Sequence, residues 1–233
     1  MREVQIRVAG WMRTASDHGG PRFLPITGVF DDETALAVRR FQEGYQLPET
    51  DGVVGEATRT CLRSLAKADG STRNFEWIEM TRTWGPGPVD PNIRENARRT
   101  LFKLEALRRK LGDVRIYIKI GYDATGAQTD EDRIGGNSQH AIAAAVDISI
   151  PDRPRPLWYQ TALTCGFTGL GPAGRHWQHC DSRLEHLGPG AEPWYAVPVF
   201  SPMPDGGLVA TYVRSAMRKA QRFPEVPRTT PAL

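Results

Sequence analysis

The chain has 233 residues, of which 39% are hydrophobic and 24% are charged, a composition typical of globular domains. Its net charge is only +3, and the positive excess lies in residues 204–233, so neither main part has the basic character of a nucleic-acid-binding protein. The three cysteines include no CxxC pair, which argues against a disulfide framework and against a cysteine-rich zinc site.

Residues 1–66 are predicted to form a small domain of three helices. Two segments, 28–34 and 52–58, repeat one pattern, in which a glycine-led turn is followed by acidic or small residues that begin a helix. Asp31 is expected to cap the first of these helices. An earlier helix includes Val4, Ile6, Val8 and Trp11, and the helix after Asp31 presents a core stripe at Ala35, Val38, Phe41 and Tyr45.

This N-terminal pattern resembles the three-helix peptidoglycan-binding domain. The residues that carry the resemblance are Gly28, Phe30, Asp31, Thr34, Ala37, Val38, Phe41, Gln42, Asp51, Gly52, Val54, Gly55 and Thr58. The resemblance implies that peptidoglycan is the partner of this domain. A helical cap that binds no ligand is the alternative, because most of these positions are core or turn residues.

Residues 67–74 are small and polar and predict a linker to a second domain, residues 75–200. That domain contains a strong helix, which we expect Asn92 to cap and Gly112 to end. The apolar stripe of the helix is Ile93, Ala97, Leu101, Leu104, Leu107 and Leu111. Its basic residues lie mostly off this stripe and are expected to face solvent: Arg94, Arg98, Arg99, Arg108, Arg109 and Lys110.

Two strands are predicted on either side of a polar loop. Between residues 114 and 120, apolar residues alternate with Arg115, Tyr117 and Lys119, which is typical of a half-buried strand. The loop covers residues 124–137, and the second strand covers residues 145–150. Loops at strand ends commonly carry functional residues.

His140, Asp147 and His179 offer the nitrogen and oxygen ligands of a catalytic zinc. The ligand atoms of one zinc lie only about 3–3.5 Å apart, because each bond is about 2.0–2.2 Å long. Seven residues of straight helix would separate His140 and Asp147 by about 10 Å. The chain must therefore turn between these two residues if they bind one metal ion.

The segment 179–183 also has the pattern of a strand, in which alternation places His179, Asp181 and Arg183 on one face. Asp181 is expected to orient the imidazole of His179, as carboxylates often do for metal-bound histidines. His176 is the candidate general base or stabiliser of the tetrahedral intermediate. This role requires the chain to bend, which Gly174 would permit.

Two motifs resemble the zinc D-alanyl-D-alanine carboxypeptidase family, which includes D-Ala-D-Ala dipeptidases and phage L-alanoyl-D-glutamate endolysins. The first motif contains Ser138, His140, Ala145 and Asp147, and the second contains His179, Asp181 and Arg183. The resemblance implies a zinc ion held by His140, Asp147 and His179, and hydrolysis of a bond in peptidoglycan stem peptides. We therefore expect an α+β protein, in which the three-helix domain precedes an antiparallel-sheet zinc peptidase domain with flanking helices.

The chain departs from the family pattern at three positions. His176 stands where sister branches place a carboxylate as catalytic base, and Ala143 stands where the family commonly has glycine. Asp123 follows Tyr122 where the family has an arginine that holds the terminal carboxylate of the substrate. A carboxylate repels another carboxylate, so an endopeptidase fits at least as well as a carboxypeptidase. Ser138, Tyr122, Asp123, Asp181 and Arg183 are the candidate supporting or substrate-contacting residues.

Residues 201–233 are predicted as an extended segment followed by a basic amphipathic helix. The helical stripe is Leu208, Val209, Tyr212, Val213, Ala216, Met217 and Ala220. The helix either packs on the peptidase domain or docks into a larger assembly, such as a phage tail or contractile injection particle.

The sequence thus predicts a zinc-dependent cell-wall peptidase targeted by its N-terminal domain. The alternatives are a wall-binding protein that has lost hydrolysis and a structural component of a phage tail or injection particle. No apolar run approaches the roughly 20 residues that span a bilayer, and the N-terminus lacks the apolar core of a secretory signal. We expect the protein to remain in the cytoplasm until lysis, a particle or a non-classical route takes it to the wall.

Overall fold

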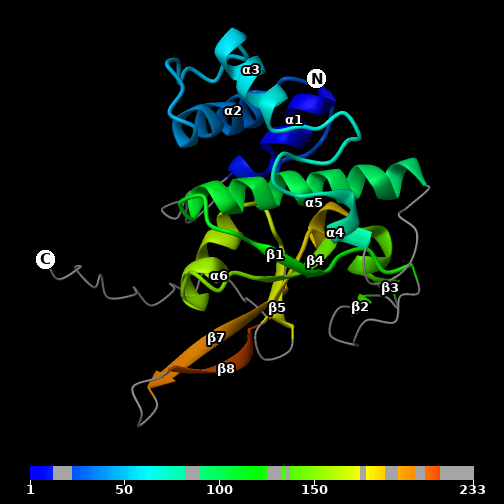
Figure 1. Ribbon diagram of the computed structural model, residues 1–233, viewed down its shortest axis with the longest axis vertical. Coiled ribbons are helices and arrows are strands. Elements are labelled where there is room, and N and C mark those ends of the chain that lie inside the picture. The colour runs from blue at the N-terminus through cyan, green and yellow to red at the C-terminus, as the bar shows by residue number, and fades with distance from the viewer. Residues whose placement is uncertain are drawn as a thin grey trace, which may run out of the picture.

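The computed structural model describes residues 1–12, 23–81, 90–124, 133–134, 137–173, 177–186, 194–202 and 208–215 (Figure 1). The fold is α+β, as the sequence predicts. The N-terminal helices lie on one side of a long helix, α5, and a β-sheet lies on its other side (Figure 1). One continuous group of buried apolar residues extends from the N-terminal helices, around α5, to the sheet.

The N-terminal part contains α1 (Arg2–Val8), a 3-10 turn (Ala9–Trp11), α2 (Asp32–Gly44) and α3 (Glu56–Ser64). Asp31 caps α2, as predicted, because its side chain accepts a hydrogen bond from the Thr34 backbone N–H at 2.8 Å. The hydroxyl and N–H of Thr34 both hydrogen-bond the Asp31 carboxylate and lower its pKa. Phe41 is fully buried in the core of this part and contacts the rings of Trp11 and Tyr45.

The first of the two repeated turns is closed by a buried glutamine. Gly28 has a φ of 82°, a left-handed conformation that favours glycine. The Oε1 atom of Gln5 accepts a hydrogen bond from Gly28 N at 2.8 Å. Its Nε2 atom donates to Val29 O at 2.9 Å and to Thr34 Oγ1 at 3.0 Å.

The second turn is closed in the same way by Gln42. Gly52 has a φ of 83°, and its N–H donates to Gln42 Oε1 at 2.8 Å. The Gln42 Nε2 atom donates to Val53 O at 2.9 Å and to Thr58 Oγ1 at 3.0 Å. The sequence repeat is therefore also a repeat of structure, in which one amide satisfies the polar groups of each turn.

The connection between the N-terminal helices and the rest of the chain is packed. Ala66 and Thr72 form an antiparallel bridge, and Thr72 is fully buried. The Glu105 carboxylate accepts hydrogen bonds from Asn74 N at 2.8 Å and from Asn74 Nδ2 at 2.7 Å. Helix α5 thereby fixes the end of the segment that the sequence predicts as a linker.

Helix α5 (Pro91–Lys110) begins two positions earlier than a cap at Asn92 predicts. Its cap is Asp90, not Asn92, and the Asp90 carboxylate accepts from Asn92 N at 2.7 Å. The prediction was wrong because Pro91 favours the first helical position, where no N–H is needed. Gly112 follows the helix with a φ of 84°, so the predicted end is confirmed.

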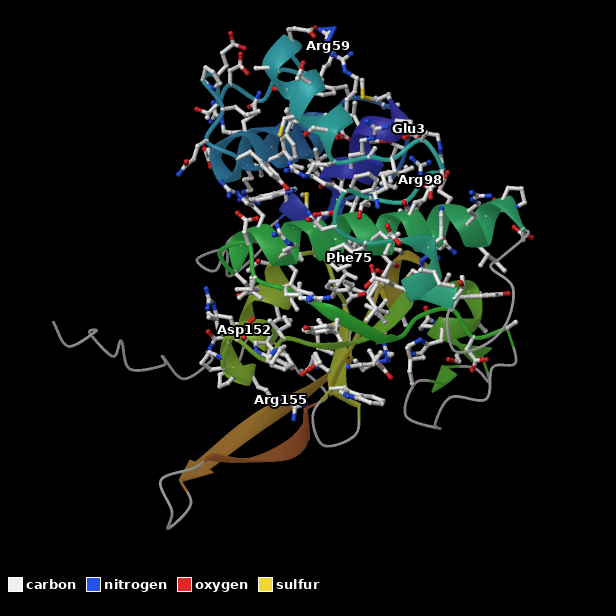
Figure 2. All side chains as sticks on the ribbon, viewed as in Figure 1. Glu3, Arg59, Phe75, Arg98, Asp152 and Arg155 are labelled. Carbon is white, nitrogen blue, oxygen red and sulfur yellow. The ribbon has the colours of Figure 1, made fainter. Side chains whose placement is uncertain are left out.

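Arg98, Arg109 and Lys110 of α5 contact the N-terminal part, so the predicted solvent face was wrong for these three residues, whereas Arg94 is exposed as predicted. Arg98 forms an ion pair with Glu3 of α1 at 2.8 Å, and Figure 2 shows these two side chains between their helices. Arg109 Nε donates to Gly44 O at 2.9 Å, and Lys110 Nζ donates to Gly10 O at 2.9 Å. Residues 100–107 are buried on every side, because α5 lies between two layers.

The sheet has the strand order β1-β4-β6-β5-β7-β8. Strands β1 (Tyr117–Ile120), β4 (Ala145–Ser149), β6 (Trp177–Asp181) and β5 (Gly169–Ala173) are antiparallel neighbours. Strands β2 (Arg133–Ile134) and β3 (Asn137–Ser138) pair separately, and the remaining helices are α4 (Trp77–Thr81) and α6 (Arg155–Thr164). Ile118, Val146, Ile148 and Cys180 are buried in the core, as the strand alternation predicts for Ile118, Val146 and Ile148.

The C-terminal part departs from the prediction. Strand β7 (Trp194–Pro202) pairs with β5 in parallel and with β8 (Leu208–Ser215) in an antiparallel hairpin (Figure 1). The predicted helix is therefore wrong over residues 208–215, and the rest of it lies outside the described residues. Val209, Thr211, Tyr212 and Val213 have high strand propensity, and β7 offers them a partner, so tertiary context decides. Within the described ranges, no helix combines the length and apolar character needed to cross a bilayer.

Candidate metal centre

His140 is held at both its ring and its backbone. It lies in a 3-10 turn, Gln139–Ile142, which Ser138 caps by accepting a hydrogen bond from His140 N at 3.2 Å. The His140 Nδ1 atom lies 2.6 Å from Gly121 O, and the His140 carbonyl accepts from Asp123 N at 3.1 Å. The segment after β1 therefore fixes the position of the imidazole.

The predicted turn between His140 and Asp147 is confirmed. The 3-10 turn ends at Ala143, which has a φ of 56° and a ψ of 24°. This left-handed conformation costs an ordinary residue roughly 1–2 kcal/mol, which is a physical reason for the glycine of the resembled motif. Strand β4 starts two residues later and brings Asp147 back to His140.

The pairing of β4 with β6 places Asp147 opposite His179. The Nδ1 atom of His179 lies 3.0 Å from Asp147 Oδ1 and 3.3 Å from His140 Nε2. The distance between His140 Nε2 and Asp147 Oδ1 is 3.5 Å. All three residues are at most 3% exposed, so the structure brings the three predicted ligands together in a buried cluster.

The partners of the two outer ring nitrogens determine the tautomers. A carbonyl oxygen only accepts hydrogen bonds, so His140 Nδ1 carries a proton and donates it to Gly121 O. His179 Nε2 lies 3.1 Å from Asp181 Oδ2 and likewise donates to an acceptor. In the neutral rings, the inner nitrogens then carry lone pairs, which face Asp147 Oδ1.

Asp181 is itself held firmly. It is fully buried, and its Oδ1 atom accepts from Arg183 N at 2.9 Å and from Arg183 Nε at 3.0 Å. Strand β6 ends at Asp181, so Arg183 begins a 3-10 turn, η4 (Arg183–Glu185), rather than extending the predicted strand. A Cβ atom on Gly169 would lie 2.2 Å from both Asp181 oxygens, so only glycine leaves room for this carboxylate.

The two aspartates of the cluster stay ionised although they are buried. Burial raises the pKa of Asp147, but when His140 and His179 carry protons on their inner nitrogens, their hydrogen bonds and charges outweigh burial and hold the pKa below its usual range. Burial likewise opposes ionisation of Asp181, and hydrogen bonds from His179 and Arg183 lower its pKa further than burial raises it. When a metal cation replaces the inner protons, the site presents one anionic carboxylate and two neutral imidazoles as its ligands.

The cluster fits a zinc ion. The 3.0–3.5 Å separations between its three donor atoms match those expected of ligands on one zinc. Two imidazoles and one carboxylate are a common donor set of catalytic zinc sites. In the part of the chain that the structure describes, no other three His, Cys, Asp or Glu residues meet so closely.

Tyr122 and Asp123, which were also predicted as site residues, lie outside the three-residue cluster. Tyr122 N donates to Met80 O of α4 at 2.7 Å, and Asp123 is fully buried on the segment that holds His140. His176 and Gly174 lie outside the described residues.

Sequence reasoning missed two glycines that shape the site. A Cβ on Gly121 would lie 2.5 Å from Met80 O, so glycine allows α4 to approach the His140 acceptor. Gly169 makes room for Asp181. The sequence places Gly121 directly before the candidate residue Tyr122, and Gly169 lies in the glycine-rich run 166–171. Only the packing shows which atoms approach these two glycines.

Comparisons with known proteins agree with both resemblances. Residues 16–62 match the family described as "Putative peptidoglycan binding domain". The chain is 35% identical over 179 residues to the "Zinc D-Ala-D-Ala carboxypeptidase" of Streptomyces albus G. That match covers 74% of this chain and 66% of the relative, so the chain spans just under two thirds of the relative's length.

Proposed function

We propose that this protein is a zinc-dependent peptidase that hydrolyses peptide bonds of peptidoglycan at the bacterial cell wall. The observation that carries the proposal is the convergence of His140 Nε2, Asp147 Oδ1 and His179 Nδ1, with both outer ring nitrogens fixed by acceptors. The similarity to a zinc D-Ala-D-Ala carboxypeptidase supports the same metal and the same class of reaction.

A zinc ion held by His140, Asp147 and His179 would supply the Lewis acidity that peptide-bond hydrolysis requires. The protein's own groups prepare the site. Gly121 O holds the proton of His140 on the outer nitrogen, and Asp181 does so for His179. Burial of the cluster excludes bulk water and strengthens every charge interaction in it.

We assign the proton transfer to His176 on the basis of sequence, since it precedes His179 by three residues. An imidazole has an ordinary pKa near neutrality and is suited to this role.

We propose that the substrate bond is internal to the stem peptide or cross-link. Asp123 is fully buried one hydrogen bond from the His140 backbone, and a carboxylate at this place disfavours a substrate that ends in a free carboxylate nearby. The N-terminal helices would hold the enzyme on peptidoglycan, in agreement with the family match over residues 16–62.

A wall-binding protein without hydrolysis is the second candidate. The observation that favours it is the absence of an acidic residue at position 176, where the resembled family supplies a carboxylate base. Digestion of the wall separates the two candidates.

The test combines zinc analysis with digestion of purified peptidoglycan. The wild-type protein is expected to contain about one zinc per chain and to release peptides that mass spectrometry identifies, which also names the bond. His140→Ala is expected to lose both, and His186→Ala, at a histidine outside the cluster, to keep both. Zinc without peptide release would favour the second candidate, and a folded wild type without zinc would refute the proposal.

A further inference from the structure

Lys103 is a fully buried cation at the centre of α5. Its ammonium donates to Ser182 Oγ at 2.7 Å and to Gly166 O at 2.9 Å, and it forms an ion pair with Glu185. The Glu185 side chain is only 4% exposed, and Arg99 lies 3.6 Å from its second oxygen. A buried charge must be paired and hydrogen-bonded to be tolerated, and Lys103 meets both conditions.

The contacts of Lys103 lie at the two ends of the short turn η4. Ser182 is the residue before this turn, and Glu185 is its last residue. The Ser182 N–H donates to Ala144 O at 3.0 Å, next to the start of β4. One lysine therefore ties the turn to α5 at both ends.

The turn η4 also positions Asp181, the carboxylate that accepts a hydrogen bond from His179. Arg183 lies within η4, and its N–H and Nε both donate to Asp181 Oδ1. Asp181 Oδ2 accepts from His179 Nε2, and the other nitrogen of His179 faces Asp147. An unbroken series of contacts thus connects Lys103 to the inner nitrogen of His179.

We infer that Lys103 and Glu185 are positioning residues for the metal centre: their buried ion pair fixes η4, and η4 fixes Asp181 and the tautomer of His179. This inference rests on the proposed function only in taking His179 as a metal ligand. It deepens that function by assigning a role to two residues whose hydrogen bonds and ion pairs include none of the three proposed ligands.

A purely structural role for the pair predicts a different outcome. Replacing a buried ion pair by uncharged groups of similar size is often neutral for stability, whereas removal of one partner is strongly destabilising. The double variant K103M/E185Q should therefore fold, whereas each single variant should be destabilised by the unpaired buried charge that it leaves behind. If the pair serves stability alone, the double variant will bind metal as the wild type does.

Lys110 supplies a matched control on the same helix. It lies two turns after Lys103, and its ammonium donates to Gly10 O at 2.9 Å and to Thr164 O at 2.8 Å. These contacts hold the N-terminal helices and the end of α6, not η4. Lys110→Met should reduce stability and leave the metal centre unchanged.

The experiment measures zinc affinity of the full-length protein by competition with a chromophoric chelator, and the tautomer of His179 by ¹⁵N NMR of the metal-free protein. K103M/E185Q is expected to keep a cooperative thermal transition while its zinc affinity falls about 10- to 100-fold, the usual effect of losing an outer partner of a ligand. Its His179 should lose the single Nε2–H tautomer. Lys103→Arg, which keeps the charge, should restore much of the affinity.

Wild-type zinc affinity and wild-type tautomer in the folded double variant would overturn the inference. An equal loss of affinity in Lys110→Met would also overturn it, because the effect would then follow stability rather than position. A wild type that binds no zinc would refute the proposed function, while the tautomer measurement would still decide whether the pair positions His179.

Discussion

Two buried polar networks in this protein are built from different kinds of group. In the N-terminal part, Gln5 and Gln42 are both fully buried, and each amide donates to two or more oxygens and accepts from one glycine N–H. In the sheet, His140, Asp147 and His179 are equally buried, but their inner atoms face one another at 3.0–3.5 Å.

The difference between the networks distinguishes a structural cluster from a binding site. Each glutamine places donors against acceptors, so its turn is complete without any further group. At the metal centre, Gly121 O and Asp181 hold the ring protons of the two histidines on their outer nitrogens. The two inner nitrogens and Asp147 Oδ1, which face one another, are then all hydrogen-bond acceptors. Such an arrangement is favourable only with a cation or proton between the donor atoms, which is why burial alone does not mark a site.

Gly169→Ala is expected to have the largest effect, which is a loss of zinc affinity at the metal centre. The new Cβ would lie 2.2 Å from both oxygens of Asp181 and displace the acceptor of His179. Zinc affinity, measured by chelator competition, should fall about 10- to 100-fold. Gly10→Ala is the control, because its Cβ would meet Ala106 Cβ at 2.4 Å between α5 and the N-terminal helices. It should lower stability only, and an equal loss of zinc affinity in both variants would contradict the assignment.

Substitutions in the glutamine network should lower stability and leave zinc affinity unchanged. Gln42→Ala removes the partners of Gly52 N and Thr58 Oγ1, and unsatisfied buried groups cost about 1–3 kcal/mol each. Denaturant unfolding should show this loss, and Gln5→Ala should show a similar one because the two turns repeat. Zinc affinity should remain at the wild-type value in both variants. A marked loss of zinc affinity would mean that the two networks are not independent.

The smallest effect is expected at the ion pair that joins the two parts. The hydrogen bond from Arg98 has the largest influence on the pKa of Glu3, and it lowers this pKa. A lowered carboxyl pKa stabilises the fold above the unfolded pKa, and this stabilisation is lost as the pH falls through the folded value. Glu3→Gln should therefore cost about 0.2–1 kcal/mol at pH 7, since Glu3 is more than half exposed, and almost nothing near pH 2.

The measurement is denaturant unfolding of the wild type, Glu3→Gln, Arg98→Ala and the double variant at both pH values. A coupling energy that persists unchanged at the acidic pH would show that the pair does not act through the Glu3 charge.

Sequence reasoning predicted the features that local patterns determine. The 24-residue repeat of glycine-led turns, the Asp31 cap and the stripe of α5 depend on neighbours a few residues away. The ligand set depended on recognising residue types at a family spacing, and a simple length argument required the turn between His140 and Asp147. These predictions needed no knowledge of how the layers pack.

Other features were decided by contacts between distant parts of the chain. Arg98, Arg109 and Lys110 contact the N-terminal part because a second layer covers α5, and residues 208–215 form a strand because β7 is available as a partner.

By itself, the sequence determined which residues are available as ligands and where the helical repeat lies, because residue type and spacing are local properties. The tertiary structure decided which nitrogen of each histidine faces the metal site and gave Lys103 its partners. Gly121 lies 19 residues from His140, and Glu185 lies 82 residues from Lys103. Proton positions and buried ion pairs depend on the groups that folding brings within hydrogen-bond distance, and no spacing along the chain specifies them.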